Sequence, residues 1–208
     1  VLTELNRMCL KYIGVSFFEL SGTTTVAETP RFEVAQNLPQ RWYGHLVGRE
    51  KELAHVLQLL SPASRHFLVI IDGIGGIGKS ALALECAHHF CNNADDLADI
   101  ERFQAIVWVS AKQSTLTGDG EVRREPVLRT LDDIYAAAAA TLRREDITRA
   151  RLAKQHEIVR SALARQRVLL IIDNLETVAE DDADAIVSFL RELPPPTKAI
   201  VTTRHQID

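Results

Sequence analysis

The stretch Phe67–Ala83, FLVIIDGIGGIGKSALA, limits what this chain can fold into more than any other part of it. The apolar run Phe67–Ile71 is typical of a buried strand, and a glycine-rich turn and a helix-forming segment follow it. Between them, Gly73–Ser80 reads GIGGIGKS and matches G-x-x-x-x-G-K-[ST] at each fixed position. Because the motif has the strand and helix that a phosphate-binding P-loop requires, we prefer that interpretation to a chance glycine-rich turn.

The residue types in this motif suit a ligand that carries several negative charges. Its glycines leave backbone N–H groups free to converge on an anion, and the following helix directs its positive end there. The lysine reaches the β and γ phosphates, and the serine hydroxyl is expected to bind Mg²⁺. The expected nucleotide-binding residues of the motif are Gly75, Gly76, Ile77, Gly78, Lys79, Ser80 and Ala81.

Composition limits the classes of partner. The 208 residues are enough for one large or two small domains, and 46% are hydrophobic, which is ordinary for a protein with a core. The formal net charge of −4 gives no overall basic field for nucleic acid or an anionic membrane. Direct nucleic-acid binding by this chain is therefore disfavoured.

The cysteines and the apolar runs indicate the compartment. Cys9, Cys86 and Cys91 are odd in number and lack C-x-x-C spacing, so neither a disulfide framework nor a zinc site is expected. No apolar run approaches the roughly 20 residues that span a bilayer, and residues 1–20 lack a signal-peptide pattern. We expect a cytoplasmic location without a membrane partner. Because the chain begins with Val1, we expect a piece of a longer protein.

The remaining segments alternate between strand and helix patterns. Strands are expected at residues 66–72, 103–111, 167–174 and 198–204, and helices at 50–60, 78–91, 126–144, 147–166 and 181–192. Residues 112–125 should form a loop or a small hairpin. This order predicts an α/β fold with a mostly parallel sheet and helices on both faces. Residues 44–208 are expected to be a P-loop nucleotide-binding domain, after a lead-in or the end of an upstream domain at residues 1–43.

Ligands of such sheets lie at the carboxyl ends of the strands, where Ser110 and Asp173 are expected. Asp173 follows the apolar run Leu169–Ile172. An acidic residue there, beside a P-loop, is a candidate Walker B aspartate that holds Mg²⁺ together with Ser80. The alternative is an aspartate that caps the next turn.

Hydrolysis of a nucleotide also needs a group that orients or deprotonates water. Many P-loop ATPases have an acidic residue directly after the Walker B aspartate, but here the residue is Asn174. An amide orients water without acting as a base. Glu176 is the nearest carboxylate, so two interpretations stay open: Glu176 is the base, or the site mainly holds nucleotide.

Two further features lie near the predicted site. Arg204 ends the last expected strand and either bridges to the γ phosphate or is an ordinary surface arginine. Trp42 and Tyr43 precede the first expected helix. They either anchor this segment to the core or form a wall for an adenine ring.

Five motifs occur in a recognisable order: LVGRE at 46–50, GIGGIGKSALA at 73–83, VWVSA at 107–111, LLIIDN at 169–174 and VTTR at 201–204. In order and spacing they resemble the NB-ARC branch of the STAND signalling ATPases, over about residues 44–208. That resemblance implies a three-layer P-loop NTPase of the ASCE type and an ATP/ADP switch with Mg²⁺. The helical and winged-helix domains that follow in that family lie outside this chain.

The resemblance also implies roles for particular residues. Val47 and Arg49 would contact the adenine, and Arg204 would be the sensor 1 arginine that reads the γ phosphate. The sheet order would be 3-4-1, with the Arg204 strand between the Asp173 strand and the P-loop strand, and a fifth strand beyond Asp208. The full-length protein would self-associate.

Three functions remain open from the sequence. The first is a switch that hydrolyses ATP slowly to ADP and phosphate and so gates oligomerisation, with Lys79, Asp173, Glu176 and Arg204 as catalytic residues. The second is a module that holds ATP or ADP with negligible turnover, which Asn174 favours. The third, a different P-loop class such as a small-molecule kinase or motor ATPase, lacks the expected lid, acceptor pocket or acidic residue after Asp173.

Overall fold

The computed structural model describes residues 32–44, 46–112, 114–117, 120–123 and 128–204. Two compact units divide the chain, Val1–Phe32 and Glu33–Asp208. Most of the lead-in expected at residues 1–43 therefore lies outside the described residues, as does Cys9. The second unit contains the sheet and the predicted site.

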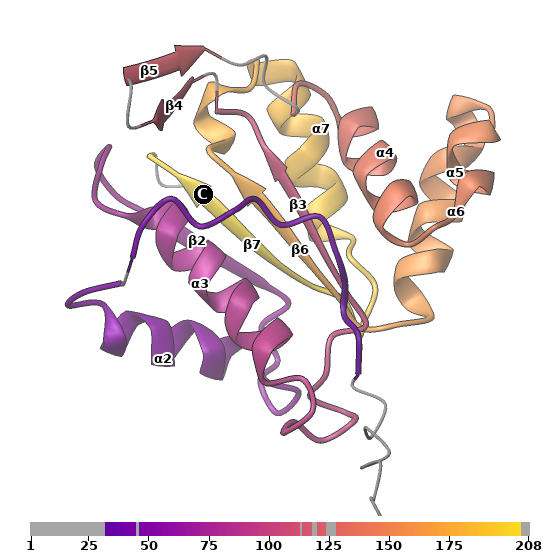
Figure 1. Cartoon of the computed structure of the whole chain (residues 1–208). Helices are drawn as coiled ribbons and strands as arrows, with labels where there is room; N and C mark the ends of the chain where they lie inside the picture. Colours follow the sequence, from indigo (N-terminus) through magenta and orange to yellow (C-terminus); the bar gives the residue numbers. More distant parts are fainter. Residues whose placement is uncertain (1–31, 45, 113, 118–119, 124–127, 205–208) are drawn as a thin grey trace, which may run out of the picture. The chain divides into compact units, whose positions relative to one another are not determined.

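A five-stranded sheet of parallel strands forms the centre of this unit (Figure 1). In spatial order its strands are β1 (Ala35–Gln36), β3 (Ala105–Ser110), β6 (Val168–Asp173), β7 (Lys198–Thr203) and β2 (Leu68–Asp72). The predicted α/β fold is confirmed. So is the placement of β7 between β6 and β2, because β7 pairs with both.

Both faces of the sheet are covered, which explains why its strands are apolar almost without interruption. Because successive strand residues face opposite sides, Val107, Leu170 and Val201 belong to the main hydrophobic cluster, whereas Trp108 and Ile171 are buried on the other side. Figure 1 shows α2 (Glu50–Leu60) and α3 (Lys79–Asn92) on one side of the sheet and the helices α4 to α7 on the other.

The second helical layer contributes apolar side chains to the main cluster. Its helices are α4 (Leu131–Thr141), α5 (Glu145–Arg149), α6 (Leu152–Ala164) and α7 (Glu180–Arg191). A 3-10 turn, η2 (Leu175–Thr177), follows β6. Beyond β3, the hairpin allowed at residues 112–125 is present as β4 (Ser114–Thr117) and β5 (Gly120–Arg123), which pair antiparallel.

Two helix predictions need correction. The helix expected at 126–144 begins only at Leu131, where Thr130 and Asp133 form a capping box. The helix expected at 147–166 is two helices, α5 and α6, separated by extended backbone at Ala150 and Arg151. No glycine or proline occurs at that break, and the helical spacing of apolar residues continues across it. The sequence therefore predicts one continuous helix there.

The short strand β1 lies in the segment expected to be a lead-in. It pairs with the start of β3, Ala35 opposite Ala105. Just beyond it, the Asn37 side chain donates to the Trp108 carbonyl (2.8 Å) and accepts from the Trp108 amide (2.7 Å). This side chain thus continues the pairing at a point where the backbone of β1 has ended.

The amino end of β7 anchors the carboxyl end of α2. The Lys198 ammonium donates to the carbonyls of Leu59 (3.0 Å), Ser61 (2.8 Å) and Ser64 (3.0 Å). The neighbouring Arg167 guanidinium donates to a further carbonyl there, that of Leu60. Two buried cations thus bind carbonyls in the last turn of α2 and in the segment that follows it. In the described part of the chain, no helix is long and apolar enough to cross a membrane.

Candidate functional site

The glycine-rich loop between β2 and α3 has the backbone that its composition predicts. The φ angles of Gly73, Gly76 and Gly78 are +145°, +81° and +97°, in a region that side chains with a Cβ rarely adopt. Gly78 is also the N-cap of α3, so the unpaired amides of the first helical turn follow the loop directly. Ser80 and Ala81 lie in that first turn.

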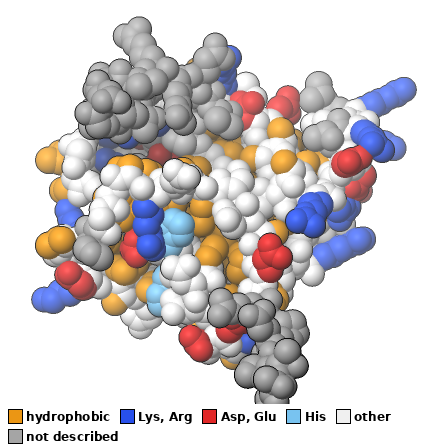
Figure 2. All heavy atoms as spheres, in the orientation of Figure 1, with side chains coloured by type: hydrophobic (Ala, Val, Ile, Leu, Met, Phe, Trp, Pro, Cys, Tyr) orange, Lys and Arg blue, Asp and Glu red, His pale blue; other side chains and the backbone are white. Residues whose placement is uncertain are grey.

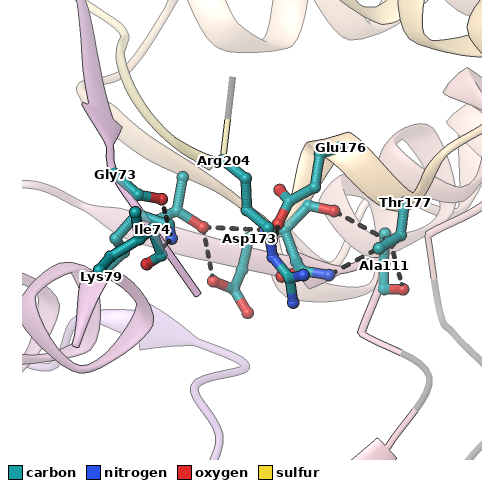
Figure 3. A network of polar contacts seen from close by, with 10 residues as sticks. Gly73, Ile74, Lys79, Ala111, Asp173, Glu176, Thr177 and Arg204 are labelled. Carbon is teal, nitrogen blue, oxygen red and sulfur yellow. Dashed lines mark hydrogen bonds and ion pairs between the residues drawn. The ribbon is translucent and has the colours of Figure 1, made fainter. Parts of the chain in front are cut away.

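The Lys79 ammonium lies across this loop. It donates to the carbonyls of Gly73 (2.7 Å) and Ile74 (3.0 Å), as Figure 3 shows. The bonds hold the positive charge inside the turn, beside the amides that would surround a phosphate. An anion in the loop would therefore meet a charge that is already positioned.

Asp173 ends β6 and is almost completely buried, with 2% of its surface exposed. Hydroxyls from both neighbouring strands fix its carboxylate: Ser110 of β3 donates to Oδ2 (2.9 Å) and Thr202 of β7 donates to Oδ1 (2.7 Å). Each oxygen keeps a lone pair that can bind a cation. Asp173 and Ser80 suit Mg²⁺, which commonly takes one or two protein ligands and completes its shell with phosphates and waters.

Asn174 is engaged in the turn that follows. Its backbone is left-handed, with φ at +66°. Its backbone N–H donates to the Thr202 hydroxyl (2.9 Å), and its side-chain Nδ2 donates to the Thr177 hydroxyl (3.3 Å). The Thr177 hydroxyl in turn lies 2.8 Å from the Ala111 carbonyl. Asn174 is therefore occupied in shaping this turn.

The turn brings Glu176 against Arg204 (Figure 3). The Glu176 side chain is only 4% exposed, and its Oε1 lies 2.9 Å from Nε of Arg204. The contact lacks hydrogen-bond alignment, and neither carboxylate oxygen of Glu176 accepts a hydrogen bond from any described residue. The Arg204 side chain is 56% exposed and packs on the P-loop, since a Cβ on Gly75 would lie 3.4 Å from its Cζ.

The segment before α2 contacts the same loop from another direction. Nη2 of Arg49 donates to the Ile77 carbonyl (3.2 Å), while Nη1 pairs with Glu52 (2.7 Å). Val47 is 83% exposed. Of the two residues expected at the adenine, Arg49 therefore contacts the P-loop directly.

Tyr43 and Trp42 differ in their surroundings. The Tyr43 hydroxyl lies 3.0 Å from both the Ala81 carbonyl and Oε2 of Glu85. Burial and this carboxylate raise the pKa of Tyr43 above its usual value. Tyr43 thus anchors its segment to α3. Trp42 is 48% exposed and contacts Tyr43 edge to face, with the Lys112 ammonium 5.9 Å from its ring centroid.

The carboxyl ends of the strands thus bring together the loop, Asp173, Glu176 and Arg204. Two features were not predicted: the clamp of two hydroxyls on Asp173 and the contact between Glu176 and Arg204. The sequence carries a signal for the first, because Ser110 is the last residue of one strand beside β6 and Thr202 is the last but one of the other. No pattern in the sequence indicates the second.

Other kinds of site receive no support from the residues that the structure covers. No group of three or more His, Cys, Asp or Glu side chains among them is arranged to hold a metal ion. Burial raises the pKa of the Cys86 thiol to about 12 and that of Cys91 to about 11, so neither forms a reactive thiolate near neutral pH.

Comparison with known proteins agrees with this geometry. A family model described as AAA ATPase domain matches residues 45–201, most of the chain. Transcription activator GutR of Bacillus subtilis (strain 168) is 30% identical over 190 residues, which cover 89% of this chain and 20% of the relative. The chain thus spans about a fifth of the length of that relative.

Proposed function

We propose that this chain, which belongs to the AAA ATPase domain family, is an ATP/ADP-binding switch domain of the NB-ARC type found in STAND signalling proteins. The observation that carries the proposal is the meeting of three parts at one edge of the sheet. They are the P-loop, the buried Asp173 and Arg204, whose guanidinium packs on Gly75. A site of this kind holds a phosphate chain and detects its length.

Each part has a distinct task in binding. The loop amides and Lys79 hold the β and γ phosphates, and Ser80 and Asp173 hold Mg²⁺, which neutralises phosphate charge when bound. Val47 and Arg49 lie toward the adenine. Arg204 binds the γ phosphate, which ADP lacks.

The site is proposed to hydrolyse ATP slowly. An amide cannot act as a general base, and Nδ2 of the Asn174 side chain already donates to the Thr177 hydroxyl. Glu176 is the nearest carboxylate, but its charge is paired with Arg204. These contacts also favour the second candidate, a module that holds nucleotide with negligible turnover.

The relative supplies a wider context. GutR is named a transcription activator, and its length is about five times what this chain covers. We infer that this domain is likewise one module of a larger cytoplasmic regulator, in which nucleotide state gates self-association. On the face that Figure 2 shows, Lys and Arg side chains are interspersed with Asp and Glu. This mixed surface agrees with a role as a switch rather than as the nucleic-acid-binding part.

The first test removes the ammonium of Lys79. Lys79→Ala should weaken binding of MgATP and MgADP by about 10- to 100-fold, the value of one hydrogen bond to a charged group. Calorimetric titration measures both affinities, and Lys154→Ala, on the exposed side of α6, is the matched control. Phosphate release by the wild-type chain over hours separates the slow ATPase from the holding module. Equal affinities in Lys79→Ala and the wild type would refute nucleotide binding by this loop.

A further inference from the structure

The Glu176 carboxylate has an unusual environment. Its side chain is 96% buried, given the 4% that is exposed, and no described residue donates a hydrogen bond to either oxygen. Burying an ionised carboxylate is costly unless charge and donors compensate it. Among the contacts found around it, the compensation comes from Nε of Arg204 at 2.9 Å. The buried negative charge of Glu176 therefore stabilises the Arg204 guanidinium in its present position.

Arg204 is the exposed member of this pair. Its side chain is 56% exposed, in contrast to the carboxylate, and it lies on Gly75 of the P-loop. In P-loop sites the loop backbone surrounds the phosphates, and the lysine of the motif reaches the β and γ phosphates. A γ phosphate would thus come within reach of a guanidinium whose Nε is already committed to Glu176.

We propose that Glu176 is a specificity-determining residue, which lowers the preference of the site for ATP over ADP by competing with the γ phosphate for Arg204. ATP gains the full contact with Arg204 only if the guanidinium turns from the buried carboxylate. ADP makes no such demand and leaves the pair intact. The proposal rests on the nucleotide-binding function above and adds a residue that does not itself touch the nucleotide.

The competition predicts a change in the ratio of two affinities. Glu176→Gln keeps the shape of the side chain but removes its charge, so Arg204 is released. Affinity for a non-hydrolysable ATP analogue should rise about tenfold, while affinity for ADP stays the same. Because the analogue is not hydrolysed, the readout is independent of any role of Glu176 in turnover.

A double-mutant cycle tests whether the effect passes through Arg204. Arg204→Met should abolish most of the preference for the ATP analogue, and adding Glu176→Gln to it should change nothing further. Asp146→Asn is the control, since Asp146 is also paired with an arginine, Arg144 at 2.7 Å, but on α5. It should leave both affinities unchanged.

The outcomes separate this inference from the proposed function. If the wild-type chain binds neither nucleotide, the proposed function fails. If it binds both through Lys79 but Glu176→Gln leaves the ratio unchanged, only the inference fails. It fails also if Glu176→Gln raises ATP affinity in the Arg204→Met background.

Should Glu176→Gln not fold, Arg204→Lys serves instead, because it retains the charge but lacks Nε. This variant should weaken the pair with Glu176 and alter the ATP/ADP ratio without altering ADP affinity.

Discussion

At the scale of single residues, the site depends on side chains that hold other side chains. Asp173 is fixed by hydroxyls of two different strands, and Thr202 serves twice, as donor to Asp173 and as acceptor from the Asn174 amide. A buried group with two partners is costly to remove, because both partners are left unsatisfied. Thr202 is therefore expected to matter for both stability and metal binding.

Thr202→Val tests this expectation, since it replaces the hydroxyl with a methyl group of similar size. Unfolding in urea should show a loss of about 1–3 kcal/mol, the usual cost of unsatisfied buried partners. A higher Mg²⁺ concentration should also be needed for nucleotide binding, because the Asp173 carboxylate is less well oriented. Thr197→Val is the matched control: it loses a buried hydroxyl that donates to the Leu163 carbonyl (2.8 Å). An equal change in Mg²⁺ dependence in both variants would contradict the role of Thr202.

Residue types at fixed spacing could be predicted from the sequence, and contacts between distant side chains could not. The loop from Gly73 to Ser80 and the acidic end of β6 are local patterns that carry their own chemistry. The pairing of Glu176 with Arg204 depends on the left-handed backbone at Asn174, which redirects η2 toward β7. Periodicity carries no information on the direction that a chain takes after such a turn.

At the scale of elements, strand β7 anchors helix α2 through its first residue. The Lys198 ammonium binds three carbonyls at the end of α2, and its side chain is buried beside Arg167. Burial, and then the neighbouring guanidinium charge, lower the pKa of Lys198 from 10.5 to about 8. The folded state therefore releases this proton at a lower pH than the unfolded state does.

This difference gives stability a pH dependence of known sign. Between about pH 8 and pH 10.5 the unfolded chain keeps the Lys198 proton that the folded chain has lost, so the free energy of unfolding contributed by Lys198 rises with pH. Below this window both states are protonated and the contribution is constant. Urea unfolding should show that the free energy of unfolding of the wild type, minus that of Lys198→Met, increases across this pH window. If this difference between the two free energies does not change with pH, the three carbonyls keep the ammonium charged in the folded state.

Elements of ordinary length were predictable, whereas the shortest ones were not. The bounds of α2 follow directly from its apolar period and from Pro62, which follows it. Strand β1 has only two residues, too few for any alternation to be visible, and its place is set by Asn37 and β3. The break between α5 and α6 likewise has no local signal.

At the scale of the whole molecule, the compact unit that contains the site begins at Glu33. Its first strand is already part of the sheet, and Tyr43 ties the next segment to α3. A shortened chain that begins at Phe32 should therefore keep the stability and nucleotide affinity of the full chain. A chain that begins at Gly44 should lose about 2–4 kcal/mol, given several lost hydrogen bonds.

Urea unfolding and ADP titration of the two shortened chains measure these effects. Asn37→Ala in the full chain is a control, and it should reproduce part of the loss because it removes both contacts with Trp108. If the chain from Gly44 is as stable as the chain from Phe32, β1 adds nothing to the domain.

The strand order has a consequence for how the protein is made. In the sheet described here the P-loop strand β2 pairs with β7, although β7 leaves the ribosome long after it. Until Lys198–Thr203 has been translated, the nascent chain carries an apolar strand without its partner, which exposes it to aggregation. The predicted nucleotide site is thus completed only after β7 has been translated, so a nascent chain that ends before Lys198 contains the P-loop motif but lacks the strand that pairs with β2.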